Sequence, residues 1–440
     1  MKRVVITGIG AVTPLGNDIE ATWENLKKGR SGIGLITRFD ASGLSSRIAG
    51  ELKGFSPEKY LSKKDILRLD PFIHYAIAAA VMALEDAGLI RRGSGVRGQG
   101  LEKQNHSSLA SAGVVIGSSR GGISTFEKSI IRSQVGTTRF RESGVRKKFI
   151  SSRLTPHILR FSPYLMPATA ISMASSYISM RFGIKGPSLG ISTACASGAN
   201  AIGEALRLIQ HGEINLSIAG GAEAPICRFA VGGYSAAGAL SKRNNNPEKA
   251  SRPFDRGRDG FVIAEGAGIL VLEELNHALK RGANIYAEIT GYGTSSDAFH
   301  MTKPDGRGEA SAIKKALNDA KISIEDVDYI NAHATSTALG DRAEIQAVKK
   351  VFGTHASGIP ISACKSMLGH MLGGAGAVEA AITALSISRG IITPVINLEN
   401  PDLDRNLNYV KKTQKKDLNT ALSNSFGFGG VNAVLVLRKF

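Results

Sequence analysis

Short apolar runs alternate with longer stretches of helical periodicity along the chain. Runs of about four to eight apolar residues predict buried strands, whereas longer amphipathic stretches predict helices. The predicted strands are Val4–Ile9, Gly113–Gly117, Leu189–Thr193, Leu216–Gly220, Gly268–Glu273, Ile285–Tyr292, Val327–His333 and Ile359–Cys364. The predicted helices are Ile19–Lys28, Phe72–Ala87, Met166–Phe182, Ala196–Ala205, Glu309–Ala320, Asp341–Phe352 and one that starts near Gly373. This alternation is typical of an α/β protein.

A weak internal sequence similarity predicts a duplication. The run that ends at Cys195 opens a helix of small residues, and the run that ends at Cys364 is followed by another such helix from Gly373. Two helices of this kind can pack closely against each other between two sheets. We therefore expect two similar halves, residues 1–274 and 275–440, with insertions near 91–108 and 128–160.

Composition excludes several classes of protein. A chain of 440 residues with 42% hydrophobic content is long enough and apolar enough for two globular halves. No run approaches the roughly 18 to 20 apolar residues that span a bilayer. The apolar stretch after Met1 is too short for a signal peptide. Three cysteines are too few for a disulfide framework or a zinc site, which favours a reducing compartment. We expect a cytoplasmic protein, or else a mitochondrial or plastid one without its transit peptide.

The positive charge of the chain is concentrated in one segment. The formal net charge is +18, and residues 128–160 hold nine Lys or Arg residues against the single acid Glu142. Such a segment is compatible with a solvated loop, a docking surface for an acidic partner, or a nucleic-acid contact. The last is least favoured because aromatic residues are not interleaved and no nucleic-acid-binding motif is present.

Cys195 is the first candidate for chemistry. The chain changes there from a predicted strand to a predicted helix, and the unpaired N–H groups of a helix start favour a thiolate. A thiolate is a good nucleophile at neutral pH. The alternative is a buried structural cysteine, since free Cys is among the most buried residue types.

Three other segments at strand ends carry polar or glycine-rich sets. A neutral imidazole can donate a hydrogen bond to an oxyanion or enolate, and a nearby lysine can order it. Glycines allow backbone N–H groups to approach a reacting carbonyl. The alternatives are structural histidines and a simple glycine-rich turn. The segments are Asn331–Asp341 with His333, Lys365–His370, and the loop predicted at Asn424–Asn432.

Together these motifs resemble those of the elongating β-ketoacyl-[acyl-carrier-protein] synthases, the condensing enzymes of type II fatty-acid synthesis. The four motifs stand in family order, and the resemblance runs from Lys2 to Leu437 and breaks at the two basic segments. The motifs are Thr193-Ala-Cys-Ala-Ser-Gly198, Asn331-Ala-His-Ala-Thr-Ser-Thr337, Lys365-Ser-Met-Leu-Gly-His370 and Asn424-Ser-Phe-Gly-Phe-Gly-Gly-Val-Asn432. The resemblance implies a thiolase-like αβαβα fold of five layers, and a homodimer. It also implies a two-stage reaction with acyl and malonyl acyl carrier protein, without a metal or organic cofactor.

The resemblance also implies roles for individual residues. Cys195 would carry the acyl group, His333 and His370 would stabilise the enolate, and Lys365 would order the histidines. The N–H groups of Cys195 and Phe428 would form the oxyanion hole. The remaining implied residues are Phe426 and Phe428 at the gate; Thr302, Thr335, Thr337, Arg120 and Tyr234 at the substrate; Glu344, Glu379 and Asp341 in support; and Lys63, Lys64 and Arg68 for carrier docking.

Three positions depart from the family pattern. Ala334 replaces a glycine, as in some organellar members, which does not put activity in doubt. Arg120 stands where long-chain bacterial enzymes have an apolar residue at the acyl pocket. Because a buried unpaired guanidinium is costly, Arg120 turns away or the pocket is shorter or more polar. Gly238 replaces an arginine that helps to dock the carrier, and we expect residues 128–160 to compensate.

Four alternatives compete with this interpretation. A degradative thiolase needs a second catalytic cysteine where this chain has Lys365 and His370. A non-catalytic chain-length factor lacks the nucleophile, and Cys195 is present. A basic nucleic-acid-binding module explains the charge but not the four motifs. The main alternative is the same chemistry in a stand-alone ketosynthase of a polyketide or specialised-lipid pathway.

Overall fold

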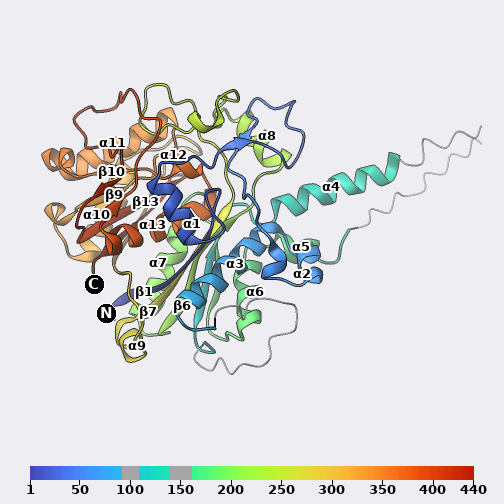
Figure 1. The fold of residues 1–440 in the computed structure, drawn as a ribbon, viewed down its shortest axis with the longest axis horizontal. Helices are drawn as coiled ribbons and strands as arrows, with labels where there is room; N and C mark the ends of the chain where they lie inside the picture. The colour runs from blue at the N-terminus through green and yellow to red at the C-terminus, as the bar shows by residue number, and fades with distance from the viewer. Residues whose placement is uncertain (92–108, 139–160) are drawn as a thin grey trace, which may run out of the picture.

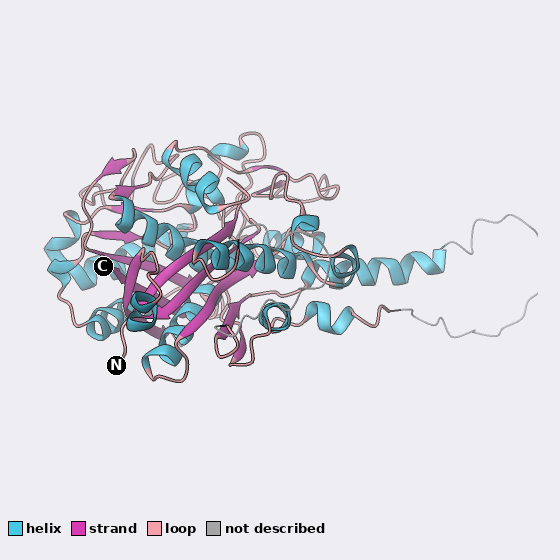
Figure 2. Cartoon of the chain, turned by 60° about the horizontal axis from the view of Figure 1, so that its bottom comes forward, coloured by secondary structure: helices cyan, strands magenta, loops and turns pink. Residues whose placement is uncertain are grey.

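A ten-stranded mixed sheet runs through the body of the protein and has helices on both sides (Figures 1 and 2). The computed structural model describes residues 1–91, 109–138 and 161–440. One half of the sheet has the order β1-β7-β6-β4-β5 and the other β8-β14-β13-β9-β10, joined where β1 pairs with β8. The bounds are β1 Val4–Val12, β4 Gly113–Gly117, β5 Ser188–Ile191, β6 Leu216–Glu223, β7 Gly266–Glu274, β8 Ala287–Ser296, β9 Tyr329–Asn331, β10 Ile361–Ser362, β13 Thr420–Gly427 and β14 Val431–Arg438.

The two halves of the sheet have the same topology. In each half the strands lie in the order first, fifth, fourth, second, third along the chain. In each half the first two neighbouring pairs are antiparallel and the last two are parallel. This agreement confirms the expectation of two similar halves.

The principal helices form three layers around the two half-sheets. Helices α7 and α13 contact strands of both halves and occupy the middle layer, while the first half-sheet carries α3 and α6 outside and the second carries α10. Helix α11 packs against α10. The bounds are α3 Pro71–Asp86, α6 Met173–Phe182, α7 Ser197–Gln210, α10 Gly306–Ala320, α11 Ala338–Phe352 and α13 Ala375–Arg389. The predicted five-layered α/β architecture is confirmed.

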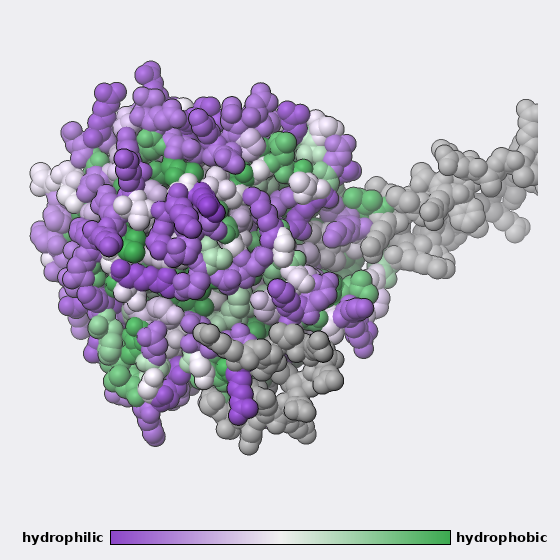
Figure 3. Space-filling view, viewed as in Figure 1, coloured by the Kyte–Doolittle hydropathy of each residue, from purple (hydrophilic) through white to green (hydrophobic). Residues whose placement is uncertain are grey.

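Smaller elements complete the body. Helix α4 begins against α5 and α8 and projects from the body in both views (Figures 1 and 2). The face drawn in Figure 3 is mostly hydrophilic, with apolar side chains in small scattered groups. The remaining helices are α1 Ile19–Lys27, α2 Lys63–Arg68, α4 Ile123–Thr138, α5 Leu165–Thr169, α8 Arg228–Ala236, α9 Leu275–Lys280 and α12 Lys365–Leu368. Two short ladders pair β2 Gly34–Leu35 with β3 Ile48–Ala49 and β11 Ile391–Ile392 with β12 Gln414–Lys415. Among the described helices, none is both long and apolar enough to cross a membrane.

Glycines allow the central helices to approach each other. A Cβ on Gly198 of α7 would lie 2.8 Å from the carbonyl oxygen of Gly373 and 2.9 Å from the backbone nitrogen of Ala377. A Cβ on Gly376 of α13 would lie 2.6 Å from Ser425 Oγ and 3.0 Å from the backbone nitrogen of Ala199. The small residues noted in the sequence therefore pack backbone against backbone in the middle layer.

Two sequence predictions of elements were wrong in detail. The helix expected over Met166–Phe182 is broken into α5 and α6, because the backbone turns at Ala170 to an extended conformation. A Cβ on Gly190 would lie only 2.7 Å from the Cα of Ser172, so this turn packs tightly against β5, a contact that periodicity cannot reveal. The loop expected at Asn424–Asn432 belongs mostly to β13 and β14, and only its centre is a turn.

The two basic insertions are described only in part. Residues 123–138, the start of the second insertion included, form helix α4 rather than a loop. Of the insertion expected near 91–108, residues 92–108 lie outside the described residues, as do residues 139–160.

Replacement of Gly376 by valine tests the middle layer. We expect Gly376→Val to lower the free energy of unfolding by about 1–3 kcal/mol, because the side chain must displace packed backbone. Gly233→Ala in helix α8 is the control, since a Cβ there meets nothing within 4 Å. Denaturant titration of both variants measures the difference. Equal free energies of unfolding of the two variants would show that the middle layer accommodates a side chain at position 376.

Candidate active site

Cys195 lies in a tight turn between β5 and α7. The strand ends at Ile191 and α7 begins at Ser197, with Ala196 as its N-cap residue. Ala194 has a φ of 49°, a left-handed conformation that is costly for a residue with a Cβ. The Ser197 hydroxyl donates to the Ala194 carbonyl (2.6 Å) and accepts from the Thr193 N–H (2.9 Å), which fixes the turn.

The surroundings of Cys195 do not favour a thiolate. Loss of water raises the pKa of the half-buried Cys195 thiol to about 11, although the Phe428 N–H, which donates to the sulfur, and the charge of Lys365 lower it. The expectation that the helix start makes Cys195 a thiolate at neutral pH is therefore wrong for the unliganded protein. Desolvation is the largest contribution to the pKa of Cys195.

His333 and His370 face each other as neutral rings. Their ring centroids are 5.3 Å apart with planes at 85°. Burial, and secondly the charge of Lys365, lower the pKa of both far below the ordinary value. Lys365 Nζ lies 3.3 Å from His333 Nδ1, and because an ammonium can only donate, the His333 proton belongs on Nε2. Both ring nitrogens of His370 lack a partner within the described residues.

Lys365 and two glutamates hold His333 from behind. The buried ammonium of Lys365 donates to the His333 carbonyl (2.7 Å) and pairs with Glu379, whose pKa is raised by burial. Glu344 accepts hydrogen bonds from the N–H groups of His333 (2.8 Å) and Ala334 (2.7 Å) and from Asn424 Nδ2 (3.0 Å). Lys365 thus contacts both the ring and the backbone carbonyl of His333, whereas Glu344 holds its backbone N–H group.

A tight turn brings two phenylalanines to Cys195. Phe426 lies on β13, and Phe428 follows in the turn to β14. Gly429 and Gly430 have φ values of 84° and 69°, which glycine adopts without strain. A Cβ on Gly427 would come within 3.1 Å of the Cys195 nitrogen. The glycines therefore let this turn approach the cysteine backbone.

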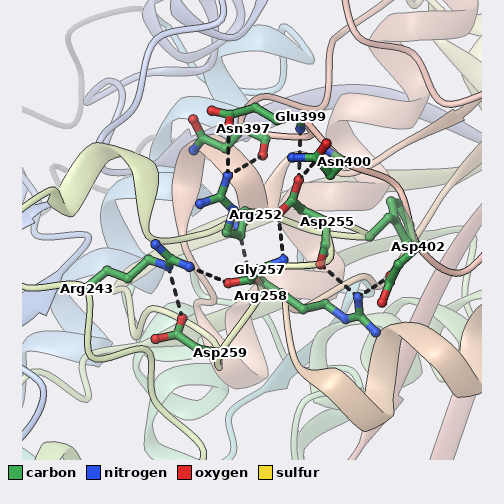
Figure 4. A network of polar contacts seen from close by, with 12 residues as sticks. Arg243, Arg252, Asp255, Gly257, Arg258, Asp259, Asn397, Glu399, Asn400 and Asp402 are labelled. Carbon is green, nitrogen blue, oxygen red and sulfur yellow. Dashed lines mark hydrogen bonds and ion pairs between the residues drawn. The ribbon is translucent and has the colours of Figure 1, made fainter.

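A network of arginines and aspartates holds the loop 251–262 (Figure 4). Arg258 Nη1 donates to Asp402 (2.6 Å), and its Nε lies 3.8 Å from Asp341. Asp255 accepts from the backbone of Asn400 (2.7 Å) and of Glu399. Burial raises the pKa of Asp341 to about 7. Its carboxyl group accepts hydrogen bonds from the N–H groups of Ser336 and Phe254 rather than facing the cysteine. The network positions the loop that lines the cavity described next.

One cavity of about 360 Å³ contains most of the predicted site residues. They line it together with backbone of the Phe428 turn. These residues are Cys195, Tyr234, Thr302, His333, Thr335, Thr337, His370, Phe426 and Phe428. The wall does not include Lys365, Glu344, Glu379 or Asp341, which lie behind it. The cavity wall also contains residues that the sequence did not single out as site residues, among them Phe261, Asp297 and Glu309. No motif marked them, because each acquires its place only when its loop or helix packs.

Arg120 is neither unpaired nor buried. Its Nε donates to Tyr234 Oη (3.0 Å), and its guanidinium lies 5.4 Å from the Tyr234 ring centroid. The side chain is exposed in the single chain and does not line the cavity. Gly238, which replaces the docking arginine, does line the cavity and adopts a φ of 66°.

The three residues expected to dock the carrier lie on α2, outside the cavity. Lys63 and Lys64 are exposed, and Arg68 stacks on the Tyr164 ring at 4.2 Å.

The duplicated fold is that of the thiolase-like acyl-transferring enzymes. Residues 1–278 match the family model for the N-terminal domain of beta-ketoacyl synthase, and residues 286–399 match that for its C-terminal domain. The chain therefore belongs to the beta-ketoacyl synthase family.

Individual relatives are similar over their whole length. The 3-oxoacyl-[acyl-carrier-protein] synthase 2 of Coxiella burnetii is 44% identical, with 100% of this chain and 99% of the relative covered. The enzyme of the same name from Staphylococcus aureus strain COL is 45% identical at the same coverage. A solved ketosynthase of a type II PKS, in complex with its acyl-carrier protein and bound to the hexaketide, has a TM-score of 0.84 and 33% identity, with 100% of both chains covered.

The pH dependence of thiol alkylation tests the environment of Cys195. With a pKa of about 11, the rate of alkylation by iodoacetamide should rise about tenfold per pH unit from pH 7 to beyond pH 10. Mass spectrometry of the peptide that contains Cys195 measures this rate, and Cys227 and Cys364 are internal controls. A plateau near pH 9, as for an ordinary thiol of pKa about 8.5, would contradict the assignment.

Proposed function

We propose that the chain is a 3-oxoacyl-[acyl-carrier-protein] synthase that elongates fatty acids by condensing malonyl carrier protein with a Cys195-bound acyl group. The observation that carries the proposal is the single cavity shared by Cys195, His333 and His370, with the Lys365 ammonium behind the histidines. The full-length likeness to two bacterial synthases supports the substrate class.

The first step is acyl transfer to Cys195. The sulfur attacks the thioester carbonyl of acyl carrier protein, and a new carbon–sulfur bond forms. The carbon–sulfur bond to the carrier breaks, and the carrier thiolate that leaves takes the proton of the cysteine. Because the pKa of free Cys195 is about 11, the proton leaves as the carbonyl is attacked. The N–H groups of Cys195 and Phe428 are the proposed donors to the tetrahedral oxyanion.

The second step is decarboxylative condensation. Malonyl carrier protein loses CO2, and the enolate that remains accepts hydrogen bonds from His333 Nε2–H and from His370. Neutral imidazoles can perform this task, because each retains one N–H group that donates to the enolate oxygen. The carbanion attacks the acyl-Cys195 carbonyl and a carbon–carbon bond forms. The carbon–sulfur bond to Cys195 breaks, and the sulfur leaves as a thiolate that takes a proton from water. Phe426 and Phe428 are the proposed gate, and Thr302, Thr335 and Thr337 the contacts for the carrier arm.

The partners are the acyl and malonyl carrier proteins and a second copy of the chain. Carrier docking on Lys63, Lys64 and Arg68 is supported by their basic side chains on α2. Strand β5 supports the dimer, because it ends the sheet and Leu189 on it is 41% exposed. An open edge of this kind pairs readily with its own copy.

The proposed halves are residues 1–274 and 275–440, since β7 ends at Glu274 and α9 begins at Leu275. The proposed location is the cytoplasm, as the matching synthases come from bacteria; a mitochondrial or plastid location is the alternative.

A second candidate is the same condensation in a polyketide or specialised-lipid pathway. The hydrogen bond of Arg120 to the cavity residue Tyr234 favours it, because it adds a cation beside the cysteine. The full-length similarity to the type II PKS ketosynthase also favours this candidate, although its sequence identity is lower than that of the two bacterial synthases.

A series of acyl carrier proteins, each loaded with one saturated chain, tests the first step. We expect intact-protein mass spectrometry to find one acyl group at Cys195 and none in Cys195→Ala. Cys227→Ala is the matched control and should be acylated like the wild type. Acylation at another cysteine would contradict the proposal. Acceptance of only very short or polar acyl groups would favour the second candidate.

His333→Ala separates the two steps. We expect the condensation rate to fall by about 10²–10³-fold, because one enolate donor is lost, while acylation of Cys195 stays within about threefold of the wild-type rate. His211→Ala, an exposed histidine, is the control. An equal loss in both steps would show that His333 does not act on the enolate.

A further inference from the structure

Glu309 is a buried acid in the wall of the cavity. It lies in the first turn of α10, with Asp305 as the N-cap residue, and is 1% exposed. A Cβ on the preceding Gly308 would lie 1.9 Å from Asp297 Oδ1, so the start of α10 presses against the end of β8. This close packing brings Glu309 to the same cavity as Cys195 and His333.

Glu309 differs from the acids around it, because they have donors. Asp297 accepts from Asn432 Nδ2 (2.7 Å), Glu344 from the His333 N–H (2.8 Å) and Asp341 from the Phe254 N–H (2.8 Å). Glu309 Oε2 is buried and has no partner among the described residues. A buried polar atom without a hydrogen-bond partner costs free energy in an unliganded protein. A ligand that forms a hydrogen bond with this atom removes the cost.

The charges around Glu309 favour its neutral form. Burial, and then the negative charges of Glu344, Asp297, Asp305 and Asp341, raise the pKa of Glu309 well above its ordinary value. A protonated carboxyl group offers one donor and one acceptor on neighbouring oxygens. A secondary amide offers the complementary pair, a carbonyl oxygen and an N–H group.

We propose that Glu309 binds an amide group of the carrier's pantetheine arm in the channel to Cys195, and so selects thioesters that carry amides over those that do not. The inference rests on the proposed function, in which this arm, with two uncharged amides, enters the cavity. A protonated acid suits such an arm better than a carboxylate, which would remain desolvated and charged beside it.

The test compares two acyl thioesters as donors to Cys195, one of pantetheine with two amides and one of 2-mercaptoethanol with none. We expect Glu309→Leu to lower kcat/KM for the pantetheine thioester about tenfold, the effect of about one hydrogen bond, through KM rather than kcat. The same variant should use the amide-free thioester as the wild type does. Glu309→Gln, with the same shape and a donor and acceptor, should stay within about threefold of the wild type on both.

Controls separate this role from a structural one. Glu325→Leu, an exposed glutamate elsewhere, should leave both thioesters unaffected. An equal loss on both thioesters, or no loss on either, would overturn the inference and leave the proposed function standing. If wild-type Cys195 accepts neither thioester nor acyl carrier protein, both fall together. Should Glu309→Leu not fold, as judged by circular dichroism, Glu309→Ala takes its place in the same comparison.

Discussion

The close approach of α7 and α13 is the constraint on which the rest of the structure depends. Gly198 and Gly376 leave no room for side chains between the helices and the backbone opposite. Each helix touches strands of both half-sheets, so this spacing sets how the halves meet. The turn with Cys195 opens α7, and the segment with Lys365 and His370 precedes α13. The spacing of the middle layer therefore also sets the spacing of the reactive groups.

The buried Lys365–Glu379 pair sets the electrostatics of the site. Both side chains are only 2% exposed, and removal of one partner from such a pair typically costs about 3–5 kcal/mol. The ammonium also lowers the pKa of both histidines and orders the proton of His333. Burial and this charge together keep the two imidazoles neutral, the state that the proposed stabilisation of an enolate requires.

Several groups of the site have a conformation or an environment that costs free energy. Ala194 carries a left-handed backbone, the Cys195 thiol is desolvated, and polar atoms of His370 and Glu309 lack partners among the described residues. Under the proposed function, an acyl group and a carrier arm would occupy the cavity beside these groups. Such sites are built for the bound state, and their unliganded form retains the strain.

The sequence by itself determined the α/β alternation, the duplicated fold and the four motifs that contain Cys195, His333, Lys365 and His370. These depend on local periodicity and on residue types that stand next to each other in the chain. Only the tertiary structure decided that Met166–Phe182 breaks in two, that Asp341 faces Ser336 and Phe254, and that Glu309 lines the cavity. It also decided the protonation of Cys195, because desolvation depends on walls contributed by segments far apart in the chain. Periodicity records which face of an element is apolar, whereas burial of a charge depends on what packs against it.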